Sequence, residues 1–164
     1  MNAALLLAVM AAAPSTEITV PALPGFTCAT RKVKTDALDM TETRCTQSVK
    51  QGSPVVVEAR LYTAITASPP EVNVLCKADL KRNHSMVFDA FESAAATVVT
   101  LRDLPACRVD ITGTHGTTGG PWRLVETTIP MKNRWLALTA QGPVSAMLAQ
   151  QATVERFLAE TAAK

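Results

Sequence analysis

The chain is poor in aromatic and charged residues, and it lacks the short motifs that mark most catalytic and metal-binding sites. Aromatic residues make up 4% of the 164 residues, charged residues make up 18%, and only two histidines are present. The sequence has no Gly-x-Ser-x-Gly elbow of a serine hydrolase and no Gly-Lys-Ser/Thr end of a phosphate-binding loop. A formal net charge of +2 is too small for a nucleic-acid-binding surface. These absences predict a protein that is not an enzyme, holds no cofactor or metal, and binds no nucleic acid.

The first thirteen residues contain no charged side chain. This stretch is far shorter than the roughly 20 apolar residues that a membrane-spanning helix needs. It matches the apolar core and small-residue end of a secretory signal peptide, although no basic residue precedes that core and Pro14 follows three alanines. An alanine-rich tail on a cytosolic protein is the alternative. We expect a signal peptide at residues 1–13, an extended segment at 14–24 and one domain at 25–162, with no transmembrane helix in the mature chain and an extracytoplasmic location, in the periplasm or secreted.

An even number of cysteines points to the same compartment: Cys28, Cys45, Cys76 and Cys107. Their wide spacing provides neither a C-x-x-C redox motif nor the close ligand pair of a zinc site. Cys28 and Cys45 fall on consecutive predicted strands, and Cys76 and Cys107 fall on the inward faces of two others. Sequential pairing, Cys28–Cys45 and Cys76–Cys107, is the simplest of the three connectivities that four cysteines allow. Buried free thiols are the alternative.

Hydrophobic periodicity predicts runs of strands and two main helices. Strand patterns occur at residues 26–31, 41–49, 54–64, 72–80, 104–113, 121–129 and 134–141. Apolar residues recur with helical spacing at about 83–99 and at 145–161. Strands that follow one another through short turns favour an antiparallel sheet over alternating β–α–β units. The expected fold class is therefore α+β.

Two polar segments have ordinary structural interpretations. Asp36, Asp39 and Glu42 lack the spacing of a calcium-binding loop, so we expect them in a solvated turn. The glycine-rich segment 113–120 carries His115 but no lysine, and it leads into a strand and not into a helix. We expect it to be a hairpin loop.

The two tryptophans are the remaining candidates for a binding role. Trp122 and Trp135 fall on the facing strands of the last predicted hairpin. A core or half-exposed pair is the ordinary interpretation of such residues. In the alternative interpretation, they are the ligand-facing residues of a groove between the sheet and a helix.

A series of short motifs runs through the C-terminal third of the chain. Residues 104–109 (LPACRV) precede the glycine-rich loop, residues 134–140 (RWLALTA) form the last strand, and residues 154–158 (VERFL) lie in the closing helix. This order resembles the ending of the PsbP-like superfamily, which includes the photosystem II extrinsic protein and the DcrB-like exported proteins. The resemblance implies an α/β/α sandwich around a central antiparallel sheet. It also implies a binding or assembly role, and it transfers no catalytic residue.

We therefore expect an exported, non-enzymatic binding or accessory protein of the cell envelope, whose partner is another protein or an envelope component. A small-molecule-binding module with a groove between sheet and helix is the alternative. An enzyme that uses His84 or His115 and a cytosolic chaperone are further alternatives, and no substrate is indicated.

Overall fold

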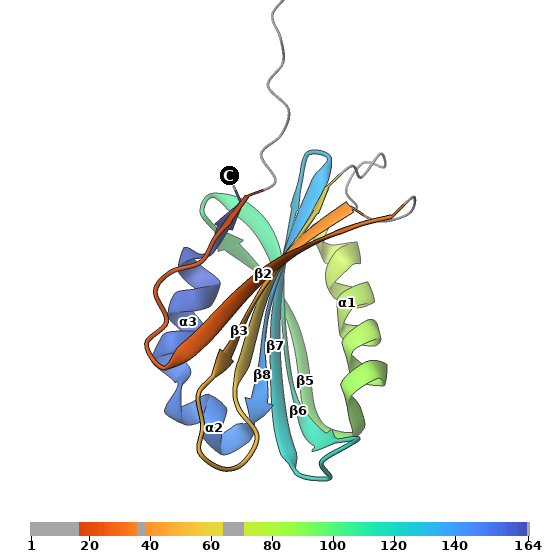
Figure 1. Ribbon diagram of the computed structural model, residues 1–164. Coiled ribbons are helices and arrows are strands. Elements are labelled where there is room, and N and C mark those ends of the chain that lie inside the picture. Colours follow the sequence, from red (N-terminus) through yellow and green to blue (C-terminus); the bar gives the residue numbers. More distant parts are fainter. Residues whose placement is uncertain (1–16, 36–38, 64–70, 164) are drawn as a thin grey trace, which may run out of the picture.

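A computed structural model describes residues 17–35, 39–63 and 71–163 (Figure 1). The expected signal peptide at residues 1–13 lies outside these ranges. A twisted, antiparallel, seven-stranded sheet dominates this part of the chain, with the strand order β2-β3-β4-β8-β7-β6-β5. Its strands are β2 (Phe26–Lys34), β3 (Asp39–Gln47), β4 (Val56–Thr63), β5 (Phe88–Leu101), β6 (Leu104–His115), β7 (Pro121–Met131) and β8 (Arg134–Pro143).

A small second sheet joins the two ends of the described chain. In it, β1 (Ile18–Thr19) pairs antiparallel with β9 (Ala162–Ala163). Leu23, between β1 and β2, belongs to the hydrophobic core. The segment that we expected to be only an extended lead into the domain therefore contributes a strand and a core residue to the fold.

Helices lie on both faces of the large sheet. The first, α1 (Val72–Val87), packs against β5 and β6, whereas α2 (Val144–Ala149) and α3 (Gln151–Glu160) lie on the opposite side (Figure 1). We call these two sides the α1 face and the α3 face. Successive strand residues point to opposite faces, so each face has its own core. The α3 core includes Val57, Leu61, Leu138 and Phe157, and the α1 core includes Leu75, Val109, Ile111 and Trp122.

The sequence-based positions of the first helix and of one strand were wrong. Residues 72–80, expected as a strand, begin α1, and most of the helix expected at 83–99 is β5. The apolar residues of the first segment fit a period of two, but Leu75, Cys76 and Asp79 are the residues buried against the sheet, which is helical spacing. The β-branched residues near the end of the second segment favour a strand, and β5 pairs with β6 along its whole length.

The closing helix was expected at residues 145–161, and the structure divides it at Gln150 into α2 and α3. Val154, Phe157 and Leu158 are buried, as their spacing indicated. Leu148, assigned to the same apolar stripe, is 57% exposed, because the break changes the direction of the chain after it. The α+β class is thus correct for a molecule in which the sheet dominates, and the helices cover only part of each face.

Candidate functional site

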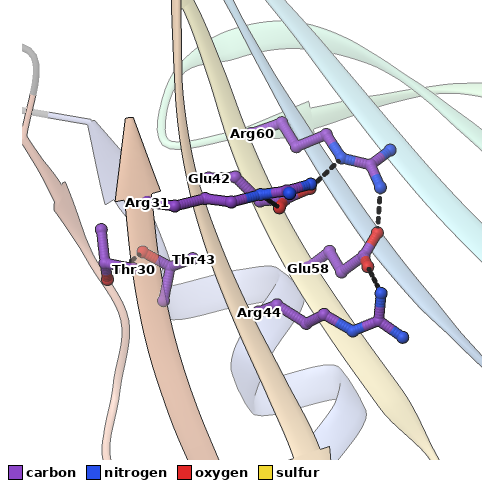
Figure 2. A network of polar contacts seen from close by, with 7 residues as sticks. All are labelled: Thr30, Arg31, Glu42, Thr43, Arg44, Glu58 and Arg60. Carbon is purple, nitrogen blue, oxygen red and sulfur yellow. Dashed lines mark hydrogen bonds and ion pairs between the residues drawn. The ribbon is translucent and has the colours of Figure 1, made fainter. Parts of the chain in front are cut away.

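Two copies of a Glu-x-Arg pattern meet on the α1 face of the sheet. Glu42 and Arg44 lie on β3, and Glu58 and Arg60 lie on β4. Their antiparallel register places Glu42 opposite Arg60 and Arg44 opposite Glu58, and Arg31 of β2 lies opposite Glu42. Because residues two apart on a strand share a face, all five side chains project on the same side (Figure 2). We call these five residues the charged ladder.

The carboxylates of the charged ladder are buried beneath its guanidinium groups. Glu42 and Glu58 are each 3% exposed. The side chains of Arg31, Arg44 and Arg60 are 68%, 55% and 33% exposed. The Nε of Arg60 donates to Oε1 of Glu42 at 2.8 Å, and its Nη2 pairs with Glu58. Arg31 pairs with Oε2 of Glu42, and Nη1 of Arg44 lies 3.1 Å from Oε1 of Glu58, so each carboxylate has two arginine partners.

The arginines keep Glu42 ionised. Burial alone would raise the pKa of Glu42, but the hydrogen bonds and positive charges of Arg60 and Arg31 outweigh it and lower the pKa below its ordinary value. Burial would likewise lower the pKa of Arg60, and its hydrogen bond to Glu42 and the charge of Glu58 raise it instead. A carboxylate held ionised in this way is a poor proton donor at neutral pH.

The charged ladder corrects the prediction made for the acidic turn. Glu42 was expected in a solvated loop with Asp36 and Asp39. In the structure it lies inside β3 with its side chain covered, Asp39 is the half-buried first residue of that strand, and Asp36 lies outside the described residues. The alternation of charge in Glu42-x-Arg44 and Glu58-x-Arg60 was the available signal, because it indicates that each strand has a polar face.

The polar surface continues from β4 across β8 to β7. Thr139 lies between Glu58 and Glu126 in the register, and its hydroxyl donates to Oε2 of Glu126 at 3.2 Å. Glu126 is 5% exposed. Threonine and carboxylate side chains therefore extend the row of polar groups into the middle of the sheet.

The adjacent row brings buried hydrogen-bond donors close to the charged ladder. Ala137 lies between Arg60 of β4 and Thr128 of β7, and Trp135 precedes Ala137 by two residues on the same face. Within the described part of the chain, the Oγ1 of Thr128 and the Nε1 of Trp135 are buried and have no hydrogen-bond partner. Such atoms are uncommon in folded proteins, and each calls for a physical explanation.

Both tryptophans lie on the α1 face, but they do not form a pair. Trp122 is opposite Gly113 and Pro143, near one end of the hairpin, whereas Trp135 is opposite Pro130, near the other. Eight residues of β7 separate these two positions, which corresponds to about 27 Å. Trp122 is 8% exposed in the α1 core, and Trp135 packs against that core.

His115 helps to hold the glycine-rich loop in place. Its Nδ1 accepts hydrogen bonds from the backbone N–H groups of Thr117 and Thr118, both at 3.2 Å. Its ring centroid lies 4.4 Å from that of Trp122. The segment joins β6 to β7, as expected of a hairpin loop.

The structure contains both expected disulfides. Cys28 and Cys45 are directly opposite on β2 and β3, with a Cα–Cα separation of 4.0 Å. Cys76 and Cys107 join α1 to β6, with a Cα–Cα separation of 5.1 Å. Cys28 is exposed, whereas the other three cysteines are buried. One bridge thus fixes the outer strand of the sheet, and the other fixes α1.

One ion pair connects the α3 face to its helix, and a second joins two strands beside it. Arg108 of β6 donates to both carboxylate oxygens of Glu155 in α3, at 2.7 and 3.1 Å. Arg123 donates to both oxygens of Asp110 at 2.7 and 3.0 Å. The hydrogen bond from Arg108 lowers the pKa of Glu155 and outweighs the opposing effect of its partial burial. The contact between Arg108 and Glu155 orients α3 on the sheet.

The described residues form neither a metal cluster nor a membrane-spanning helix. In those ranges no three His, Cys, Asp or Glu side chains gather closely enough to hold a metal ion. His84, the second histidine, lies within α1. No helix of the described chain has both the length and the apolar character to cross a membrane.

Comparisons with known proteins establish the fold and no more. No family model matches the chain, and no curated protein matches it in sequence. Several solved structures are similar to it, including the following two. LpqN of Mycobacterium tuberculosis, involved in cell envelope biogenesis, has a TM-score of 0.60 and 13% identity, over 92% of this chain and 86% of LpqN. PA94 of Pseudomonas aeruginosa, a protein of unknown function, has a TM-score of 0.59 and 8% identity, over 82% of this chain and 97% of PA94. The PsbP-like resemblance stays a prediction.

Proposed function

We propose that the protein is an exported, non-enzymatic binding or accessory protein of the cell envelope that acts through a protein partner. The observation that carries the proposal is the pair of disulfides. Structural disulfides persist in oxidising compartments, and a bridge with an exposed cysteine such as Cys28 is open to reductants in the cytosol. An extracytoplasmic location is consistent with both bridges.

The envelope role rests on the similarity to LpqN, whose name describes a part in cell envelope biogenesis. At 13% identity this similarity supports a common architecture, and the shared role is our proposal. We also propose that the chain belongs to the PsbP-like superfamily. The superfamily includes exported proteins, which would account for the extracytoplasmic location and for a binding role without catalysis.

The charged ladder is the surface that we assign to the partner. Its three guanidinium groups exceed its two carboxylates by one positive charge, and the exposed arginines lie outermost. Arg31 and Arg44 are held over buried carboxylates, which reduces the freedom that they would lose on binding. An acidic segment of a partner protein fits this surface, because guanidinium groups bind carboxylates in a two-pronged geometry.

Photocrosslinking in the envelope of the host cell tests this proposal. A photoreactive phenylalanine derivative replaces Arg44 in the full chain, and the matched control carries it at Lys50, an exposed residue outside the ladder. We expect one discrete heterologous adduct from position 44 that is absent from position 50. Equal or no adducts at the two positions would contradict the proposal.

A small-molecule-binding module is the second candidate function. It is favoured by the unpartnered Oγ1 of Thr128 and Nε1 of Trp135, which lie on the α1 face around Ala137, the residue of β8 opposite Arg60. A ligand with hydrogen-bond acceptors would satisfy both donors. Native mass spectrometry of protein purified without denaturation tests this function, since a bound molecule adds a fixed mass. A Trp135→Phe variant should lose that mass, whereas an unmodified mass for both proteins would exclude a stably bound ligand.

A further inference from the structure

The two outer strands of the large sheet differ in how they are protected. An outer strand presents unpaired backbone groups to which another strand can bind, and proteins commonly block it with charge. β2 carries three exposed basic residues for this purpose: Arg31, Lys32 and Lys34. β5 pairs with β6 on one side only, and no residue between positions 93 and 101 is charged or is proline.

The first part of β5 is protected, and the second part is not. Register shifts interrupt its pairing between Phe88 and Ala90 and again between Phe91 and Ser93, and Asp89 and Glu92 are exposed there. From Ser93 onward the pairing with β6 is regular. Residues 93–101 are all exposed or half-buried, so no other strand of the described chain covers this regular, uncharged edge.

Apolar side chains add to this edge. Val98 of β5 is 46% exposed, and Leu104, the first residue of β6 and the partner of Leu101, is 40% exposed. They are two of the five large hydrophobic residues that are exposed in the described chain. Exposed apolar groups on an unprotected strand edge mark a surface that another strand covers.

We propose that a second copy of this chain covers the edge, and that two β5 strands pair antiparallel about a two-fold axis at Thr97. The sheet of one copy would then continue into the sheet of the other. A two-fold interface must be complementary to itself, so residues equidistant from the axis face one another. The sequence of β5 meets that condition, as its side-chain volumes and its charges show.

Small side chains of one copy face larger ones of the other in this register. Ala96 lies opposite Val98 of the second copy, Ala95 opposite Val99, and Ser93 opposite Leu101. Cross-strand neighbours of this kind stabilise antiparallel pairs, and no like charges meet along the nine residues from position 93 to 101.

Opposite charges flank the two ends of the paired segment. Glu92 lies five positions before Thr97, at the second register shift of β5, and Arg102 lies five positions after it, in the turn from β5 to β6. In that turn Arg102 and Asp103 adopt φ angles of 51° and 62°, and the Nη2 of Arg102 donates to the carbonyl oxygen of Ala159 at 2.9 Å. The two-fold axis brings the Glu92 end of each copy to the Arg102 end of the other. Register and charge therefore select the same axis, which favours a second copy over an unrelated extended peptide.

Cysteine substitution tests the register. At a two-fold axis the Cα atoms of opposite residues lie about 4.5–5.5 Å apart, so Thr97→Cys should form an intermolecular disulfide under mild oxidation. Thr100→Cys is the matched control, because six residues of strand, about 20 Å, would separate its two copies. Peptide mapping checks that both native disulfides remain. Crosslinked dimer from position 97 and none from position 100 is the expected result, and equal crosslinking at both positions would overturn the proposed register.

Light scattering after gel filtration tests the dimer itself over about 1–100 μM protein. We expect a concentration-dependent dimer that Thr97→Lys weakens at least tenfold, since two lysines would meet on the axis. Thr27→Lys on the opposite edge is the matched control and should leave the dimer unchanged. A monomer throughout this range, including one that binds an extended peptide along β5, would overturn the proposal. The dimer does not depend on the proposed function, and the two are tested separately.

Discussion

Replacing Glu42 with glutamine should destabilise the protein far more than its position near one side of the sheet suggests. The substitution keeps the shape of the side chain, but it removes a buried charge that Arg31 and Arg60 contact. A hydrogen bond to a charged group contributes about 1.5–3 kcal/mol. The contact with Arg31 contributes at the lower end of this energy range, because Arg31 is largely exposed to solvent. Arg60 keeps its pair with Glu58. We expect a loss of about 2–3 kcal/mol, below the 3–5 kcal/mol measured when fully buried pairs are broken.

Thermal and denaturant unfolding measure this loss. For a domain of this size the expected fall in Tm is about 5–10 °C. Glu160→Gln is the matched control, because Glu160 is an exposed partner of Arg156 within α3, and its loss should cost less than about 0.5 kcal/mol. The double variant Glu42→Gln/Arg60→Gln should be less destabilised than the sum of its single variants. The reasoning is refuted if Glu42→Gln and Glu160→Gln have the same stability.

The same residue determines part of the response to acid. The folded-state pKa of Glu42 lies below its unfolded value. The contribution of the ionised Glu42 to the free energy of unfolding is therefore complete above about pH 5, and it is lost as the pH falls through the folded pKa. The stability difference between the wild type and Glu42→Gln should therefore shrink between about pH 5 and pH 3. Denaturant midpoints at a series of pH values measure it, and a difference that stays constant would contradict the assignment.

Two further predictions concern α1 and the sheet. Replacing Cys76 and Cys107 with alanine should lower the free energy of unfolding by about 3.7 kcal/mol, the value of the chain-entropy model for a separation of 31 residues. The same change should increase hydrogen exchange in α1. Unchanged exchange in α1 would contradict the role of this bridge. Gly142→Ala should cost about 1–3 kcal/mol, because its Cβ would lie 3.2 Å from the Cα of Val55, whereas Gly120→Ala meets no atom within 4 Å and should be nearly neutral in the same unfolding assay.

The sequence predicted the strands of the large sheet better than it predicted α1. Strands β6, β7 and β8 follow one another through short turns, and alternation in each is strong enough to define its faces. In α1 the apolar residues fit a period of two, and Asp79, which is buried at a helical position, weakened the helical pattern. Pairing with the next strand, β6, across a two-residue turn decides that residues 88–101 form a strand.

The disulfides and the charged ladder differ in how well the sequence alone predicts them. Sequential pairing could be predicted as the simplest of three connectivities, although Cys76 lies in α1 and not on the strand expected there. The ladder depends on which residue of β3 faces which residue of β4, and that register emerges only when the sheet is assembled. The two Glu-x-Arg patterns indicate polar strand faces, but the alignment of Glu42 with Arg60 is a property of the fold.

The most direct test of the central claim is the oxidation state of the cysteines in protein recovered from cell fractions. The full chain is expressed in its host, the fractions are alkylated under denaturing conditions, and intact masses are measured. We predict that the protein is found outside the cytoplasm without the residues of its leader, and that none of its four cysteines is alkylated. Protein in the cytosolic fraction with all four cysteines alkylated would contradict the account.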